Sequence, residues 1–169
     1  MQQLFNLLKK AESSKIYLRL LNYITNRTVR FNKPHGFKII KITPEFAQTF
    51  APYHKKNFNH VRGIHACAIA TVGELAAGLI LMNHFSPKEY RLIMSQIHID
   101  YHYQAKRDII ATASLLPHDK EHIMNELKEK KKTTQPIITE IKDANQQSIA
   151  TVVSTWQIKS WDDVRTQVK

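Results

Sequence analysis

Residues 66–82 form a long apolar segment that contains one charged side chain, Glu74, near its middle. As a helix, this segment would be apolar around its whole circumference, and such a helix is buried on all sides. The wider stretch 63–85 reaches the lower length limit for a membrane span, but a carboxylate at the centre of a span is costly. We therefore expect a core helix over about residues 66–83, in which Gly73 and Gly78 would let a strand or a second helix approach closely.

Most of the chain after residue 35 has the pattern of β-strands. Apolar residues recur at every second position, which is typical of a strand with one buried face. The predicted strands are 37–43, 46–54, 91–103, 108–116, 136–142 and 148–158. A charged helical segment over 119–132 is expected as an insertion that is not part of the core. Because helices do not alternate with the strands, we predict an α+β fold in which a curved antiparallel sheet wraps around the long buried helix.

The strand predicted over 91–103 carries three residues of metal-binding types, His98, Asp100 and His102. Period two places them on one face. The opposite face is apolar: Ile93, Ile97, Ile99, Tyr101 and Tyr103. Alternate side chains on one strand lie ~6.6 Å apart, which is long for neighbouring ligands of one ion. We expect a solvated outer face here and no metal site.

The basic residues are concentrated at the N-terminus. Of the net charge of +11, residues 1–43 contribute +8, from nine basic residues and one acid, Glu12. Leucines at helical spacing predict an amphipathic helical segment that Ser13 and Ser14 could split in two. These leucines are Leu4, Leu8, Leu18 and Leu21. We expect their face to pack on the sheet, and peripheral membrane contact is the less favoured alternative.

We divide the chain into a basic helical extension over 1–34, a main domain over 35–160 and a tail over 161–169. The one cysteine, Cys67, excludes an internal disulfide and a multi-cysteine zinc site, and it fits a reducing, cytoplasmic location. Cys67 could be a nucleophile at the start of the helix, but a small apolar filler is the favoured interpretation.

Several classes of function lack their motifs. Phosphate-loop, dinucleotide-binding and G-x-S-x-G sequences are absent. Basic and aromatic residues do not interleave as they do in known RNA-binding modules, so a nucleic acid is not an expected partner.

Glu74 is the strongest candidate for chemistry on the residues alone. It is the only charged residue between Gly63 and Ser86. A carboxylate in such surroundings is rarely buried unless it is paired or functional. Burial would raise its pKa and make it a useful base near neutrality. A structural glutamate bonded to a neighbouring hydroxyl or backbone group is the alternative.

Residues 59–74 resemble the signature of hotdog-fold acyl-CoA thioesterases, in particular the phenylacetyl-CoA thioesterase type and its uncharacterised relatives. That signature has an Asn, a Gly four residues later, a His at plus six and an acidic residue nine beyond the His. Asn59, Gly63, His65 and Glu74 match all of these spacings. The order of strands extends the resemblance to residues 35–158. It implies the hotdog fold, with the N-terminal helical segment as an addition.

Two residues depart from the signature. Many relatives have two glycines after the His, where this chain has Ala66 and Cys67, and many have Asp in place of Glu74. The resemblance implies thioester hydrolysis without a cofactor, with a coenzyme A thioester as the substrate. Glu74 would act as general base or nucleophile, and the backbone N–H of Ala66 would polarise the carbonyl. Asn59 would hold the water or the carbonyl, while His65 would orient the loop that includes Gly63.

The spacing also bears on assembly. Glu74 lies nine residues beyond His65, or ~13 Å along a regular helix, so one chain cannot bring both the helix N-terminus and this carboxylate to one carbonyl. Two antiparallel helices across a two-fold axis can do so, with the donors of one subunit facing Glu74 of the other. We therefore predict a homodimer with two shared sites, and a dimer of dimers stays open.

The positive charge suits the phosphates of coenzyme A, and Lys106 and Arg107, in the turn after the long strand, are the predicted contacts. The acyl group stays open, as does the carrier, coenzyme A or acyl carrier protein. A hotdog hydratase or dehydratase is disfavoured because those relatives place the His and the acid further apart. A non-catalytic acyl or lipid binder is the main alternative.

Overall fold

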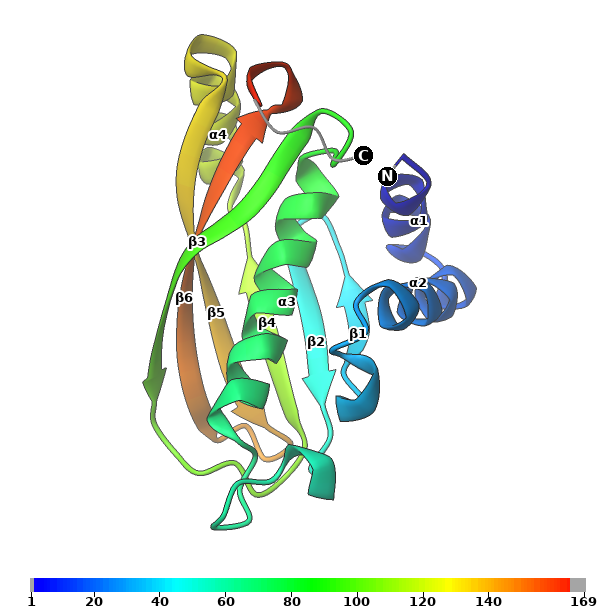
Figure 1. Ribbon diagram of the computed structural model, residues 1–169, viewed down its shortest axis with the longest axis vertical. Coiled ribbons are helices and arrows are strands. Elements are labelled where there is room, and N and C mark those ends of the chain that lie inside the picture. The colour runs from blue at the N-terminus through cyan, green and yellow to red at the C-terminus, as the bar shows by residue number, and fades with distance from the viewer. Residues whose placement is uncertain (1, 165–169) are drawn as a thin grey trace.

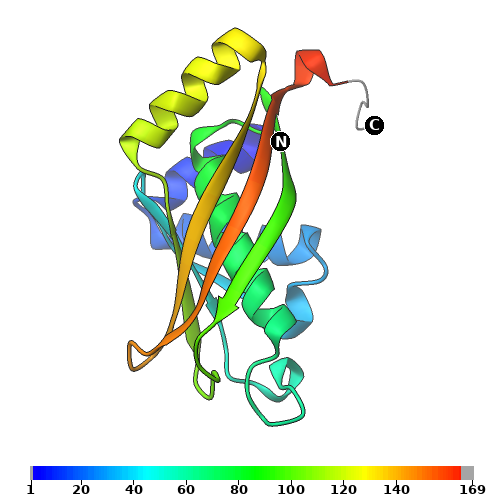
Figure 2. The same ribbon diagram turned by 90° about the vertical axis from the view of Figure 1, so that its left-hand side faces the viewer.

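The computed structural model describes residues 2–164. A six-stranded antiparallel sheet curves around one long helix, α3 (Ala66–His84), as Figures 1 and 2 show from two sides. The strands are β1 (Lys38–Ile42), β2 (Phe46–Ala51), β3 (Tyr90–Tyr101), β4 (Ile109–Ser114), β5 (Lys132–Asp143) and β6 (Ser148–Ser160). The other helices are α1 (Gln2–Ala11), α2 (Lys15–Thr28) and α4 (Pro117–Lys130). The predicted α+β class and the curved antiparallel sheet are confirmed.

The order of the strands across the sheet is β1-β2-β4-β5-β6-β3. The strand that follows α3 in the sequence therefore pairs with the last strand and lies at the far edge from β1. A hairpin joins β5 and β6 around residues 143–147, as the turn residues predicted. The predicted helical insertion is α4, but the expectation that it lies outside the core was wrong, because Ile123 and Leu127 pack into the core at one end of the sheet.

Helix α3 packs closely because two glycines face the sheet. A Cβ at Gly73 would lie 2.9 Å from Cγ2 of Val152, and one at Gly78 would lie 3.1 Å from the ring of Trp156. The close approach predicted at both positions is confirmed. In residues 2–164, α3 is the one helix long and apolar enough to cross a membrane, and most of its apolar residues are buried inside the fold.

The expectation that α3 is buried on all sides was wrong for one stripe. Thr71, Glu74 and Leu75 are half-buried, and the first turn at Ala66 and Cys67 is exposed. The sheet covers one side of the helix and α1 part of another. The remaining side therefore faces outward in the single chain.

A β-bulge at Ser95 changes which side chains of β3 face the core. Before the bulge Leu92 and Met94 face inward, and after it residues 97–101 present their odd-numbered side chains instead. Of the predicted apolar face, only Ile99 packs against the core, whereas Ile93, Ile97, Tyr101 and Tyr103 are exposed. One inserted residue inverts the alternation of a strand, and the sequence pattern does not mark the insertion.

The N-terminal segment forms two helices that separate at Ser13 and Ser14, as predicted. Leu8 and Leu21 are fully buried, and Leu4 and Leu18 pack against the same core. The prediction that this face packs on the sheet holds for α2, which contacts β1, whereas α1 contacts α3.

The two edges of the sheet differ. At the β1 edge, Nδ2 of Asn22 on α2 donates to the backbone O of Ile39, and Oδ1 accepts from the N–H of Ile39, both at 2.7 Å. The amide thus takes the place that a neighbouring strand would occupy and closes this edge. At the other edge, no strand in the described chain pairs with the outer side of β3.

We expect Asn22→Ala to destabilise the protein, because it leaves both backbone groups of the buried Ile39 without partners. The loss in the free energy of unfolding should be about 1–3 kcal/mol. Urea denaturation measures it. Asn26→Ala, one turn along the same helix, is the matched control because the described chain gives the Asn26 side chain no hydrogen bond. Equal losses in both variants would contradict the role of Asn22 as an edge cap.

Candidate functional site

Glu74 lines a cavity of about 430 Å³ on the outward-facing side of α3. Its walls are mostly apolar and come from four parts of the chain. They include Val29 and Phe31 after α2, Leu75 and Met82 on α3, and Leu92 and Trp156 from β3 and β6. The cavity is therefore suited to an apolar group placed beside a carboxylate.

The carboxylate of Glu74 stands without a protein partner. Within residues 2–164 it makes no hydrogen bond or ion pair, and burial raises its pKa above the ordinary glutamate value. The alternative of a structural glutamate bonded to a neighbouring group thus finds no support in the described chain. A buried carboxylate that holds its proton to a higher pH than usual is a typical general base.

A second cavity, of about 310 Å³, lies at the N-terminus of α3. Asn59, Ala66, Tyr101 and Gln104 are among its lining residues. Oδ1 of Asn59 accepts from the N–H groups of Val61 and Gly63, at 3.1 and 2.9 Å, and so shapes the loop. Its Nδ2 group donates to no other residue of the described chain and is free to bind a ligand.

The first turn of α3 leaves one N–H group available. His65 is the N-cap residue, and its Nδ1 accepts from the N–H of Cys67 at 3.1 Å. The N–H of Ala66 has no acceptor among the described residues. A free N–H at a helix N-terminus is a suitable donor to a developing oxyanion.

The structure brings some of the predicted site residues together and separates others. Asn59 and Ala66 share the second cavity, whereas Glu74 lines the first, and the two cavities have no lining residue in common. Glu74 lies eight positions beyond Ala66 on α3, which corresponds to about 12 Å along the helix. One chain therefore presents the donors and the carboxylate in different places.

Gly63 lies where two loops meet. A Cβ at this position would lie 2.8 Å from Cγ of Gln104, and the neighbouring Ile64 N–H donates to the O of Ala105 at 2.8 Å. These contacts hold the loop before α3 against the loop that carries Lys106.

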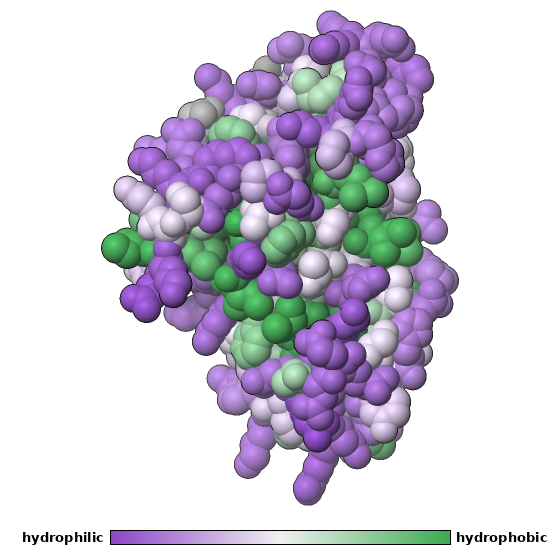
Figure 3. Space-filling model, turned by 180° about the vertical axis from the view of Figure 1, so that it is seen from behind, coloured by the Kyte–Doolittle hydropathy of each residue, from purple (hydrophilic) through white to green (hydrophobic). Residues whose placement is uncertain are grey.

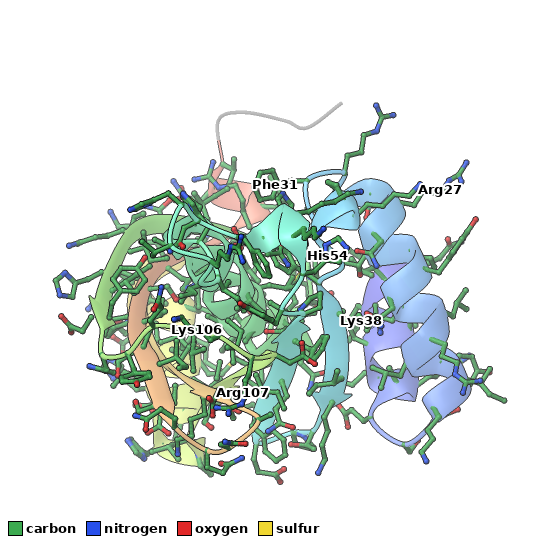
Figure 4. The ribbon with its side chains drawn as sticks, turned by 90° about the horizontal axis from the view of Figure 1, so that it is seen from below. Arg27, Phe31, Lys38, His54, Lys106 and Arg107 are labelled. Atoms are coloured by element: carbon green, nitrogen blue, oxygen red, sulfur yellow. The ribbon has the colours of Figure 1, made fainter. Side chains whose placement is uncertain are left out.

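Lys106 and Arg107 lie at the same end of the molecule as the N-terminus of α3. In Figure 4, which views the molecule from this end, Arg107 and Phe31 lie on opposite sides. Both are exposed. Arg107 lies 3.7 Å from the buried carboxylate of Asp143, whereas Lys106 has no ion pair in the described chain. Arg62, with a left-handed φ of 57°, adds a cation to this end that the sequence analysis missed.

The residues considered for other chemistry lie apart from both cavities or are exposed. His98 and Asp100 project from the exposed outer face of β3, 3.4 Å apart. His102 is exposed, contacts Thr151 and lines the second cavity. No group of three metal-ligating side chains exists within residues 2–164. Cys67 is exposed, so its interpretation as a buried apolar filler was wrong.

The walls of the Glu74 cavity were not predicted from the sequence. Val29 and Phe31 belong to the segment predicted as an extension, and Trp156 lies 82 positions beyond Glu74. No local pattern connects these residues, because only the tertiary fold brings them to α3.

Comparison with known proteins agrees with this architecture. Residues 19–158 match the model of a family described as "Domain of unknown function (DUF4442)". No curated protein matches the chain. Among solved structures, a protein of unknown function from Pseudomonas aeruginosa, described as a probable thioesterase, has 21% identity and a TM-score of 0.78, over 84% of this chain and 95% of that one.

Two further structures are similar at lower identity. A substituted form of a thioesterase enzyme from Staphylococcus aureus has 18% identity and a TM-score of 0.65, over 77% of this chain and 98% of its own. A thioesterase from Haemophilus influenzae has 10% identity and a TM-score of 0.70, over 88% and 94%. At these identities the likeness establishes the fold, and the expected hotdog fold is confirmed.

Proposed function

The chain belongs to the DUF4442 family, and from that premise and the geometry of its two cavities we propose that it is a thioesterase that hydrolyses acyl-coenzyme A. One observation carries the proposal. A half-buried, unpartnered carboxylate and a free helix N-terminal N–H lie on one helix, each in its own cavity, and hydrolysis of a thioester needs both kinds of group.

The proposed reaction uses Glu74 as the general base. Glu74 takes a proton from water while the water oxygen bonds to the thioester carbon, and the carbonyl oxygen becomes an oxyanion that accepts from the N–H of Ala66. Nδ2 of Asn59 holds the oxyanion or the attacking water. When the intermediate collapses, the C–S bond breaks and the proton on Glu74 passes to the leaving sulfur. The products are a carboxylic acid and free coenzyme A.

The donors and the base would meet in a homodimer. The β1 edge is closed by Asn22, whereas the outer side of β3 is unpaired and exposes Ile93, Ile97 and Tyr101. An unpaired apolar edge strand is suited to antiparallel pairing with its own copy across a two-fold axis. The proposed pairing places the outward side of one α3 against that of the other, so that each Glu74 faces its partner's helix N-terminus.

The loops at the N-terminus of α3 would bind the carrier. Arg62, Lys106 and Arg107 supply positive charge there for the phosphates of coenzyme A. The acyl group would occupy the apolar cavity beside Glu74. We place the protein in the cytoplasm, where acyl-coenzyme A and the reduced form of Cys67 are both found.

A panel of acyl-coenzyme A substrates of graded chain length, with detection of the released thiol, tests the proposal. We expect turnover that depends on the acyl group, and sedimentation of the parent as a dimer. Tight acyl-coenzyme A binding without thiol release would favour the second candidate, a non-catalytic acyl binder. One observation supports that candidate, because His65 already occupies the N–H of Cys67 and leaves a single donor.

A further inference from the structure

Helix α2 has an apolar stripe on the side that faces away from the protein. Ile16, Leu20 and Tyr23 follow the i, i+4, i+7 spacing of one helix face and are 75%, 44% and 62% exposed. Leu18 and Leu21 on the opposite face already pack into the core. Figure 3, which shows α1 and α2 at its left edge, has apolar side chains protruding there among hydrophilic ones.

The stripe lies within a strongly basic part of the chain. From Ser13 to Pro44 there are seven basic residues and no acid. Lys15, Arg19, Arg27 and Arg30 are all exposed, and within residues 2–164 none of the four forms an ion pair. Exposed apolar residues bordered by unpaired cations are typical of a helix that lies in the interface of an anionic bilayer.

The apolar surface continues to the mouth of the Glu74 cavity. Val29 and Phe31 follow α2 directly, are 45% and 57% exposed, and form one wall of that cavity. Figure 4 shows Arg27 and Phe31 along the same side of the molecule.

We propose that α2 and the loop through Phe31 form a docking face for an anionic phospholipid membrane. In the docked state Ile16, Leu20 and Tyr23 enter the acyl boundary, the basic residues contact the phosphates, and Phe31 brings the cavity mouth to the lipid surface. Because β1 and β3 are opposite edges of the sheet, and α2 packs at the β1 edge, pairing through β3 leaves the stripe of Ile16, Leu20 and Tyr23 free.

The charge distribution argues against a second copy of the chain as the occupant. A two-fold contact through α2 would place the basic side chains of one copy against those of the other, with no acid between residues 13 and 44 to offset them. A single-stranded nucleic acid could stack on Tyr23 but would leave Ile16 and Leu20 exposed.

Vesicle sedimentation with the full chain tests the proposal. The probes are vesicles of phosphatidylcholine alone and of phosphatidylcholine mixed with phosphatidylglycerol, at low and high salt. We expect binding to the anionic vesicles that weakens with salt. Each cation near an anionic surface contributes about fivefold, so Arg19→Gln/Arg27→Gln should weaken binding by about 25-fold.

The apolar part is tested by Ile16→Ser/Leu20→Ser/Tyr23→Ser. Loss of even one inserted aliphatic side chain corresponds to about tenfold weaker binding, and we expect at least this loss. Leu116→Ser/Ile138→Ser, at exposed apolar positions elsewhere, is the matched control and should bind like the parent. Circular dichroism establishes that all variants are folded.

Three results would overturn the proposal. The first is a parent protein that does not sediment with anionic vesicles. The second is equal loss of binding in the Leu116→Ser/Ile138→Ser control. The third is a parent protein that self-associates or binds a single-stranded oligonucleotide, together with a triple variant that loses this binding but still binds vesicles like the parent.

Discussion

Glu74→Gln should lower kcat for acyl-coenzyme A hydrolysis by about 10²–10⁴-fold, which is the usual contribution of a general base. The substitution keeps the size of the side chain but removes the proton acceptor. The loss is expected in kcat more than in KM, because a base acts in the transition state. Steady-state kinetics with thiol detection measures it. Glu121→Gln, the same chemical change at an exposed position on α4, should leave kcat unchanged.

The pH dependence of the parent should identify the same group. Burial raises the pKa of Glu74, and only the ionised form is a base, so activity should rise with pH through that raised pKa. This limb should be absent in Glu74→Gln. Parental activity that does not change across the acidic range would contradict the role of Glu74, as would a variant as fast as the parent.

The stability of the parent and of Glu74→Gln should differ in the sense opposite to that of their activities. Between the ordinary carboxyl pKa of about 4.3 and the raised value, the folded protein binds more protons than the unfolded chain. The contribution of Glu74 to stability is thus fully present below this window and is lost as the pH rises through it. Glu74→Gln lacks this decrease, so at neutral pH its free energy of unfolding should equal or exceed that of the parent.

Ala66→Pro should lower kcat by about 10²–10³-fold, the effect of removing one oxyanion donor. Proline is tolerated at the first position of a helix, where its missing N–H is unpaired within the helix in any case. It also requires an extended residue before it, and His65 has φ −64° and ψ 142°. The variant should therefore fold normally, with a midpoint of thermal unfolding at or above that of the parent.

Ala66→Val is the control for this variant, because it adds bulk at the same position and keeps the N–H. If it loses as much activity as Ala66→Pro, the effect is steric and the donor role is wrong. A proline variant that keeps full kcat would also exclude Ala66 as a donor.

Mixing Glu74→Gln with Ala66→Pro tests whether the site is shared. Each mixed dimer has one site with both defects and one intact site. Random pairing makes half of the dimers mixed, so about a quarter of the parental activity should return. Sites contained within single chains would give no recovery.

The sequence determined the main elements of this fold for reasons that are local. An apolar segment of helical length must be buried, and segments in which apolar and polar residues alternate must pair into a sheet. The positions of α3 and of the strands therefore followed from short local patterns of apolar residues. The spacing from His65 to Glu74 likewise predicted that the helix N-terminus and the carboxylate lie apart in one chain, because the rise per residue fixes distances along a helix.

Other features depend on contacts that no local pattern contains. The pairing of β3 with β6, the bulge at Ser95 and the half-exposed side of α3 are set by how the whole sheet closes around the helix. The cavity beside Glu74 exists because Phe31 and Trp156, 125 positions apart, reach the same face of α3. The sequence alone thus determined which side chain is an isolated carboxylate, while only the tertiary structure decided what surrounds it, since burial depends on residues distant in the chain.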